Sequence, residues 1–108
     1  MNIKFSSQSV TFKISEEELK SLIVDKKLIE SLLISGQKVS FAIFPVQSGE
    51  MVLDLTEGFA FSLQLPNPKI QELSEMGKSR DGIFLLQDNL KIFVQVDVKS
   101  DTRSRKKD

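Results

Sequence analysis

The sequence contains no cysteine, histidine, tryptophan or tyrosine. Without cysteine the chain has no disulfide, no thiolate metal site and no cysteine nucleophile. Without histidine it lacks the commonest general base and the usual ligand of zinc and haem. All eight aromatic residues are phenylalanine, whose ring has no polar group and favours cores over wet recognition surfaces. We therefore expect no catalytic residue, no cofactor and no metal site.

Long apolar segments are absent as well. No apolar run approaches the roughly 20 residues that span a bilayer. Residues 1–14, MNIKFSSQSVTFKI, lack the apolar region of a secretory signal. These two absences predict a cytoplasmic protein without a membrane partner. The length of 108 residues, with 40% hydrophobic and 28% charged side chains, is typical of one globular domain.

The charge is balanced overall but unevenly placed along the chain. There are 15 basic and 15 acidic side chains, yet residues 99–108 carry five basic against two acidic ones, which is +3 and leaves −3 for residues 1–98. A mildly acidic body attracts phosphate backbones poorly. We expect residues 1–98 to form a single α+β domain and residues 99–108 to be a basic, disordered tail. The candidate partner contacts are Arg103, Arg105, Lys106 and Lys107.

Two strand–helix units follow from apolar spacing and capping residues. Residues 10–14 and 61–65 alternate apolar and polar side chains, which is the period of a half-buried strand. Ser15 and Glu18 form a capping box that predicts a helix start. A second helix is predicted with Asn67 as its N-cap, Pro68 at its first position and Gly77 just past its end.

Residues 26–34, KKLIESLLI, fit the spacing of a helix as well as that of a strand. Their counterpart later in the chain, GIFLLQD (82–88), is short and bracketed by turn residues, which favours a strand. We therefore predict a strand over residues 28–34. The dipeptides Ser35-Gly36 and Asp88-Asn89 suit hairpin turns.

Each half of the chain then follows the order hairpin, helix, hairpin. The halves are residues 1–44 and 51–98, and residues 10–44 are predicted to superpose on 61–97 about a pseudo-twofold axis. Leu22 and Leu73 would occupy equivalent buried places. The predicted fold is α+β, a mostly antiparallel sheet of about eight short strands, curled or barrel-like, with two helices packed on it and a possible internal duplication.

The segment EGFAFSLQL (57–65) resembles the ribonucleoprotein octapeptide that stacks RNA bases on aromatic rings. Glu57 stands where that motif has a basic residue. If Phe59 and Phe61 faced RNA, the strand period would bury Ser62 and Gln64. We predict instead that Phe59, Phe61, Leu63 and Leu65 face the core, and nucleic acid is not an expected partner.

An enzyme is the alternative that the residues leave open. A pocket that holds two of Glu30, Asp54, Glu57 and Asp97 at carboxylate-pair distance would favour a carboxylate-dependent enzyme. Ser35 and Lys38 have the S-x-x-K spacing of hydrolases with a lysine base, although Ser35 lies in a predicted turn. A weak nucleic-acid binder that works through the tail is the second alternative.

The run IKFSSQSVTFKISEEELKSL (3–22) resembles the opening of a family of small bacterial proteins of unknown function. The segments LQLPNPKIQEL (63–73) and LKIFVQVD (90–97) are similar to the second strand-helix unit and the last strand of that family. The similarity spans residues 2–97, and this chain lacks the acidic residue and cysteine that follow the last strand there. The resemblance implies no activity. We expect a non-enzymatic binding or assembly module whose partner is an unknown protein or a second copy, paired through a strand edge.

Overall fold

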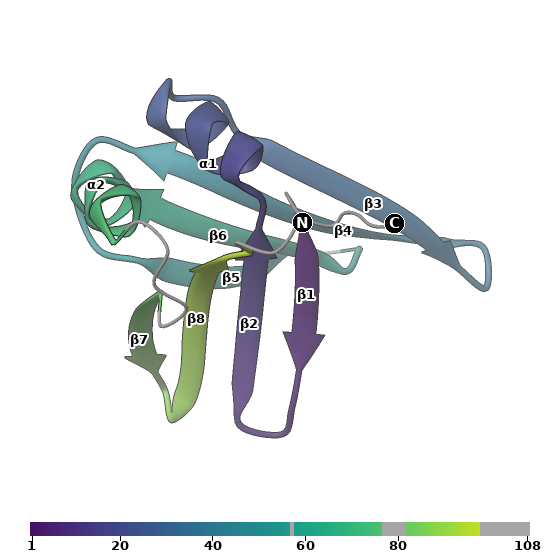
Figure 1. The fold of residues 1–108 in the computed structure, drawn as a ribbon. Coiled ribbons are helices and arrows are strands. Elements are labelled where there is room, and N and C mark those ends of the chain that lie inside the picture. Colours follow the sequence, from purple (N-terminus) through teal and green to yellow (C-terminus); the bar gives the residue numbers. More distant parts are fainter. Residues whose placement is uncertain (57, 77–81, 98–108) are drawn as a thin grey trace, which may run out of the picture.

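The structure is a computed structural model that describes residues 1–56, 58–76 and 82–97. These residues form eight strands and two helices, which confirms the α+β class (Figure 1). In chain order the elements are β1 (Asn2–Phe5), β2 (Ser9–Ile14), α1 (Glu16–Ile23), β3 (Leu28–Ile34), β4 (Gln37–Val46), β5 (Val52–Thr56), β6 (Ala60–Pro66), α2 (Asn67–Glu75), β7 (Ile83–Gln87) and β8 (Leu90–Val96). Neither helix reaches the length and apolarity of a membrane span in the part of the chain described.

The strands form two four-stranded sheets. Sheet A has the order β1-β2-β8-β7, and sheet B has the order β3-β4-β6-β5. Each sheet joins two antiparallel hairpins through a parallel central pair, β2 with β8 and β4 with β6. The expectation of one curled or barrel-like sheet is therefore wrong: two mixed sheets are present, and they do not close into a barrel in the described ranges. Apolar spacing identifies strands but carries no information about which strand pairs with which.

The two sheet orders have the same pattern. Sheet B, taken from its other edge, is β5-β6-β4-β3, so each position matches a position of sheet A held by the other half of the chain. The first hairpin of each half lies in one sheet, and the second hairpin lies in the other. This exchange explains the parallel central pairs, because hairpins alone produce only antiparallel neighbours.

The start of α1 is as predicted. The backbone N–H of Glu18 donates to Ser15 Oγ at 3.0 Å, and the backbone N–H of Ser15 donates to Glu18 Oε1 at 2.8 Å. The start of α2 differs by one residue, because Pro66 is the N-cap and has no side-chain hydrogen bond. Its ring fixes φ at −67° in the extended region that an N-cap requires, which leaves Asn67 as the first helical residue. The predicted stop at Gly77 lies outside the described residues.

The strand predicted over residues 28–34 is confirmed as β3. The β3–β4 hairpin turns through Ser35 (φ 52°) and Gly36 (79°), and the β7–β8 hairpin turns through Asp88 (51°) and Asn89 (68°). Turns of this kind match the twist of the strands that they join and favour small or amide-bearing residues.

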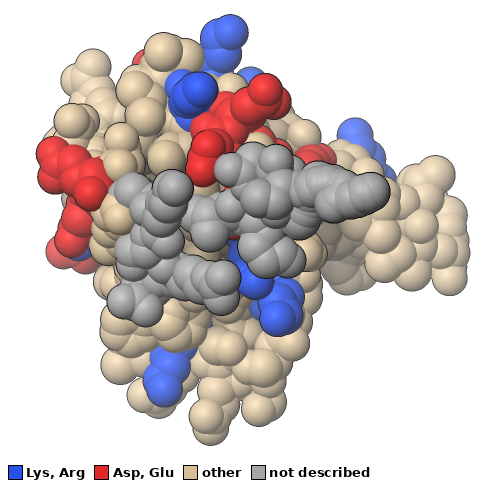
Figure 2. All heavy atoms as spheres, viewed as in Figure 1, with Lys and Arg blue, Asp and Glu red and all other residues tan. Residues whose placement is uncertain are grey.

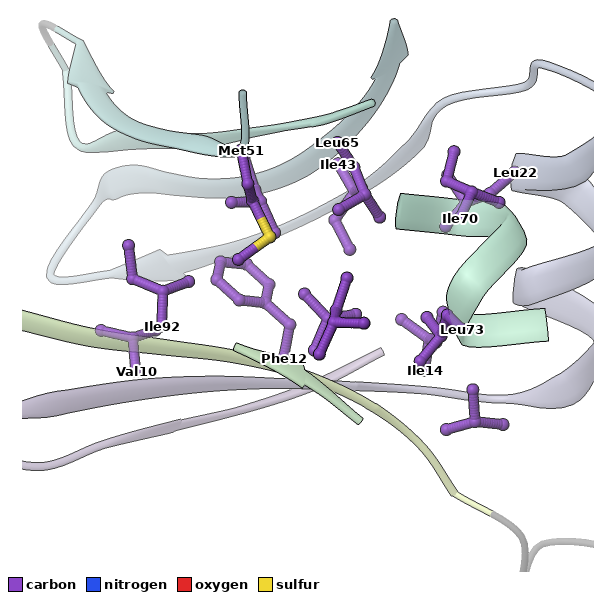
Figure 3. Packing of buried hydrophobic residues seen from close by; sticks show 14 residues of the cluster. Val10, Phe12, Ile14, Leu22, Ile43, Met51, Leu65, Ile70, Leu73 and Ile92 are labelled. Atoms are coloured by element: carbon purple, nitrogen blue, oxygen red, sulfur yellow. The ribbon is translucent and has the colours of Figure 1, made fainter. Parts of the chain in front are cut away.

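The core lies between the two sheets, whose strands run across one another in Figure 1, and the helices cover one end of it. In Figure 3, Phe12 from sheet A points toward Met51, while Ile70 and Leu73 of α2 close the helical end. Leu22 and Leu73 are 0% and 2% exposed, so both helices are anchored by a buried leucine.

The side chains of the GFAF segment do not all face the core. Leu63 and Leu65 are fully buried as predicted, but Phe61 is half-buried and Phe59 is 53% exposed. Phe59 lies before β6 in a turn and has a φ of 62°, so it does not share the alternation of the strand. Its prediction as a core residue is wrong because the strand begins at Ala60, one residue after Phe59.

Candidate functional site

The carboxylates named for an enzyme are not brought together where the structure describes them. Glu30 lies on β3 and Asp54 on β5, the two opposite edges of sheet B. Three strand spacings separate these edges, which is about 14 Å. The register also places them on opposite faces, because Glu30 is aligned with Phe41 and Asp54 with Ser62. Glu30 and Asp54 therefore form no carboxylate pair.

The other candidates from the sequence that the structure describes lie at a hairpin and at a strand end. Ser35 occupies a tight turn and Lys38 lies in the next strand, so their spacing is that of a hairpin. Asp97 directly follows β8, and its backbone N–H donates to the carbonyl of Ile14 at 2.7 Å. Glu57 lies outside the described residues, as do the candidate tail contacts Arg103, Arg105, Lys106 and Lys107.

The most exposed apolar segment of the described chain is β3, an edge strand with β4 as its one neighbour in sheet B. Five of its seven residues are apolar, and six of the seven are exposed. The exposed fractions are 52% for Ile29, 47% for Leu32, 72% for Leu33 and 55% for Ile34. An edge strand of this kind offers unpaired backbone groups and apolar side chains on both faces, which is the usual template for adding another strand.

The position of β3 follows from its hairpin with β4. Figure 1 shows the turn end of this hairpin extending beyond sheet A, and the same part projects at the right of Figure 2. The side chains near the turn thus lose the opposing sheet that buries their neighbours closer to the helices. Leu28, at the helical end of β3, packs against the core, whereas Leu33 and Ile34 do not.

One charged residue, Glu30, interrupts the apolar sequence of β3, and its charge is compensated. The amino group of Met1 donates to Glu18 Oε2 at 2.8 Å and to Glu30 Oε2 at 2.9 Å. Burial lowers the pKa of this amine, but its hydrogen bonds with the two carboxylates outweigh that effect and raise the pKa. The charge of Glu30 therefore opposes the pairing of another strand with this edge less than an isolated carboxylate would.

The pKa of Glu18 moves in the opposite direction. Burial raises it, but the hydrogen bond from the Met1 amine and the backbone N–H of Ser15 outweigh burial, so that the pKa is lowered. The amine and the two carboxylates thus connect the first residue of the chain, α1 and β3 in one ionic cluster.

A groove of about 380 Å³ separates the edges of β1 and β3. It is lined by Met1, Ile3, Phe5, Glu30, Ser31, Leu32 and Phe41. The rings of Phe5, Phe41 and Phe61 form a cluster, with Phe41 stacked on Phe61 at 5.2 Å between ring centroids and Phe5 at 5.7 Å from Phe61. Phe5 is 55% exposed, so this cluster keeps an accessible apolar side.

The opposite flank, formed by β5 and β7, is joined by a side chain. Gln87 Oε1 accepts from the backbone N–H of Leu53 at 3.0 Å, and Gln87 Nε2 donates to the carbonyl of Leu53 at 2.9 Å. These two bonds reproduce what a neighbouring strand would supply at one residue. The edge of β5 is thereby capped at Leu53 by a residue of the other sheet.

The fold and this site define a small α+β protein of two sheets that carries one long, apolar and free strand edge. Comparison with protein-family models, with curated proteins and with solved structures finds no match. The family resemblance drawn from the sequence therefore stays a prediction.

Sequence reasoning found the strand β3 but not its position at an edge. A strand with apolar residues on both faces is typically buried in the middle of a sheet, and nothing local shows otherwise. The role of Gln87 was also missed. The one local signal was a polar side chain at the end of an otherwise apolar strand, just before the turn at Asp88-Asn89.

Proposed function

We propose that this chain is a non-enzymatic assembly module and that β3 is its interface. The observation that carries the proposal is the free edge of β3, which is seven residues long and exposes four large apolar side chains. Such a surface is a liability for a monomer, because it invites pairing with other strands. A function that covers it by strand pairing accounts for its composition.

The partner that fits best is a second copy of the same chain. Most strands alternate polar and apolar side chains and would match only one face of β3. A second β3 is apolar on both faces, and two copies can meet in an isologous interface with twofold symmetry. The resulting antiparallel pair would join two copies of sheet B into one continuous sheet.

The sequence of β3 favours one register for this pair. With Ser31 opposite Ser31 of the second copy, all seven residues are paired, and Ile29 lies opposite Leu33 on one face. On the other face Glu30 lies opposite Leu32, beside the groove. Shifting the pair by two residues toward the start of the strand would place two Glu30 side chains opposite each other, and like charges destabilise a cross-strand pair.

We also propose that the chain is an internal repeat of residues 1–44 and 51–98. The matching strand orders of the two sheets and the buried leucine on each helix, Leu22 and Leu73, support this proposal. An experimental structure in which residues 10–44 fail to superpose on 61–97 would end it. The repeat matters for function because it allows an internal comparison. Each strand of the flank formed by β1 and β3 has a counterpart in the flank formed by β5 and β7.

Substitution of Leu33 by lysine tests the interface. Leu33 is 72% exposed, so Leu33→Lys should leave the fold intact while placing a charge within the paired strands, opposite Ile29 of the second copy. We expect a dimer for the unchanged protein and a monomer for Leu33→Lys by sedimentation equilibrium. The matched control is Leu55→Lys, because Leu55 is 64% exposed on the opposite edge of the same sheet. The proposal is refuted if the unchanged protein is monomeric at all concentrations. It is also refuted if the Leu33→Lys variant stays dimeric.

The register is tested by a disulfide, for which the chain offers a background free of cysteine. Directly opposed residues of antiparallel strands have Cα atoms about 4.5–5.5 Å apart, within the range that a disulfide can bridge. Ser31→Cys should therefore form a covalent dimer on mild oxidation. In the same register two cysteines at position 33 are four residues apart along the strands, so Leu33→Cys should cross-link far more slowly. The reverse order of rates would exclude this register.

A further inference from the structure

The outer face of sheet A, which lies away from the core, combines lysines, hydroxyl and amide side chains and two phenylalanines. Buried residues alternate along β2 and β8, so the intervening side chains point outward. The outward residues of the four strands are Asn2, Lys4, Ser9, Thr11, Lys13, Phe84, Leu86, Lys91, Phe93 and Gln95. This set has three lysines and no acidic residue.

The register aligns these residues in rows across the sheet. One row consists of Lys4, Thr11, Phe93 and Phe84, in the order of the strands. The next rows contain Lys13 with Gln95 and Lys91 with Leu86. Lys4 therefore lies in the same row as the two phenylalanines, and Lys13 and Lys91 lie in the rows on either side of it. Hydroxyl and amide side chains stand between them.

Phe84 and Phe93 form an aromatic pair on the outer face of sheet A. Their ring centroids are 5.2 Å apart with an interplanar angle of 38°; Phe84 is 51% exposed and Phe93 is half-buried. A phenylalanine that served only the core would point inward with Ile83 and Val94. On the solvent side of the sheet the exposed ring of Phe84, supported by Phe93, instead offers an aromatic surface to a planar ligand.

The charge of this face contrasts with the negative charge of the domain as a whole. In Figure 2 the lower part of the molecule, where the strands of sheet A lie in Figure 1, shows lysine in blue among tan residues, while red carboxylates gather higher in the view near the helices. A hollow of about 350 Å³ at one side of the face is lined by Lys4, Lys13, Ser9 and Thr11 among others. This gives ammonium and hydroxyl groups a shared concave surface beside the rings.

We propose that the outer face of sheet A binds single-stranded nucleic acid, with bases on Phe84 and Phe93 and phosphates on Lys4, Lys13 and Lys91. Stacking on aromatic rings combined with lysine contacts to the backbone is the general means of binding single strands without sequence preference. The expectation that nucleic acid is not a partner rested on the total charge of residues 1–98, on the GFAF segment and on the absence of tyrosine and tryptophan. None of these observations shows that strand pairing brings three lysines and two phenylalanines onto one face.

Nucleic acid fits this surface better than a lipid membrane does. The phenylalanines lie on the face of sheet A beside polar side chains, so they cannot enter a bilayer without burying Thr11 and Gln95. The same polar side chains can donate to and accept from the edges of unpaired bases. Residues 99–108 carry a charge of +3 in the sequence, which adds a general attraction for phosphate groups.

Fluorescence anisotropy of the full chain with a labelled oligo(dT) or oligo(U) of about 16 nucleotides tests this proposal at low salt. We expect Phe84→Ala to weaken binding about tenfold, since each stacked base contributes substantially to affinity. Phe84→Tyr keeps the ring and should retain binding. Phe59→Ala, which removes an equally exposed phenylalanine from the turn before β6, should have no effect and serves as the matched control.

The salt dependence of binding distinguishes the contribution of the lysines on this face from that of other basic residues. Each of Lys4→Ala and Lys91→Ala should reduce the slope of log affinity against log salt by about 0.7, the value for one phosphate contact to a single strand. Lys20→Ala, on the exposed side of α1, should leave the slope unchanged. Deletion of residues 99–108 should weaken binding but preserve the ratio between the unchanged protein and Phe84→Ala.

Three outcomes would overturn the proposal. The first is the absence of binding at low salt, and the second is binding that disappears with residues 99–108 and is indifferent to Phe84 and the lysines. The third is binding of the full chain to vesicles that contain phosphatidylserine without binding to either oligonucleotide. None of these outcomes depends on β3, so the Leu33→Lys monomer should bind the oligonucleotide as the unchanged protein does.

Discussion

The flank formed by β5 and β7 and the flank formed by β1 and β3 have the same order of elements but opposite surface properties. On the first, Gln87 reaches across from sheet A and makes two hydrogen bonds with the backbone of Leu53 in sheet B. On the second, a groove separates the two edge strands, and β3 exposes most of its apolar side chains. On the first flank a side chain bonds to the edge backbone of the other sheet, whereas on the second the Met1 amine bridges to the Glu30 side chain and a groove remains beside them.

Matched positions show how few residues produce this difference. In the alignment that places Leu32-Leu33 against Leu85-Leu86, Glu30 of β3 corresponds to Ile83 of β7. Ile83 is 4% exposed and belongs to the core, whereas the side chain of Glu30 is half-exposed and bound to the Met1 amine. Ile34 corresponds in the same way to Gln87. Ile83 and Gln87 thus close the flank formed by β5 and β7. Glu30 and Ile34, at the matching positions, leave the flank formed by β1 and β3 open.

The largest expected effect on this comparison comes from the anchor of the closed flank. Ile83→Ala removes a core side chain and should lower the free energy of unfolding by about 2–5 kcal/mol. Leu33→Ala on the open flank should change the stability of the monomer by no more than about 0.5 kcal/mol, as exposed positions do. Urea denaturation at low protein concentration measures both. Similar losses for the two variants would show that the flanks do not differ in packing.

A smaller effect is expected from the hydrogen bonds that join the closed flank. Gln87→Ala leaves the N–H and carbonyl of Leu53 to water and should cost about 1–2 kcal/mol, since each net hydrogen bond contributes about 1 kcal/mol. Amide hydrogen exchange at Leu53 should also become faster. Gln37→Ala, at the exposed start of β4, is the control and should change neither quantity. Unchanged exchange at Leu53 in Gln87→Ala would mean that the side chain does not cap β5.

The smallest effect is expected from the ionic cluster of the open flank, and it depends on pH. The pKa of the Met1 amine is raised on folding, so its stabilisation is fully present below its ordinary value of 8.0 and is lost as the pH rises through the raised pKa. The pKa of Glu18 is lowered, so its stabilisation is present above 4.5 and is lost as the pH falls through the lowered pKa.

Because Glu30 is half-exposed, the alkaline loss should be about 1 kcal/mol or less. It is measured by urea denaturation between neutral pH and about pH 10. Nα-acetylation removes the charge of the amine and should remove this alkaline loss while leaving other titrations in place. Identical pH profiles for the acetylated and the free protein would show that the cluster does not stabilise the fold.

Local features of the chain were predictable where neighbouring residues alone decide them. The capping box of Ser15 and Glu18, both hairpin turns and the strand over residues 28–34 are all present. The errors lie at element ends: α2 begins one residue before the predicted helix, and Phe59 lies in a turn. A shift of one residue at such an end moves a side chain to the other face. The exact boundary depends on backbone geometry, which apolar spacing does not encode.

The candidate sites were less predictable than the elements. A strand of five apolar residues indicates burial on both faces, but β3 is exposed because its hairpin extends past the opposing sheet. Lys4, Lys13 and Lys91 each stand between apolar residues in the sequence, and this pattern could have marked an outward basic face. That the three share one face with Phe84 and Phe93 depends on the parallel pairing of β2 with β8.

The sequence by itself determined the elements of this protein, because capping, turn conformation and the apolar period act over a few residues. It also determined the chemistry that is missing, since a chain without histidine or cysteine cannot use either. Only the tertiary structure decided which strands pair, and with that which edges are free and which faces are shared. Pairing joins residues far apart in the chain, such as Thr11 with Phe93, and its energy comes from cross-strand contacts that do not exist until both strands are in place.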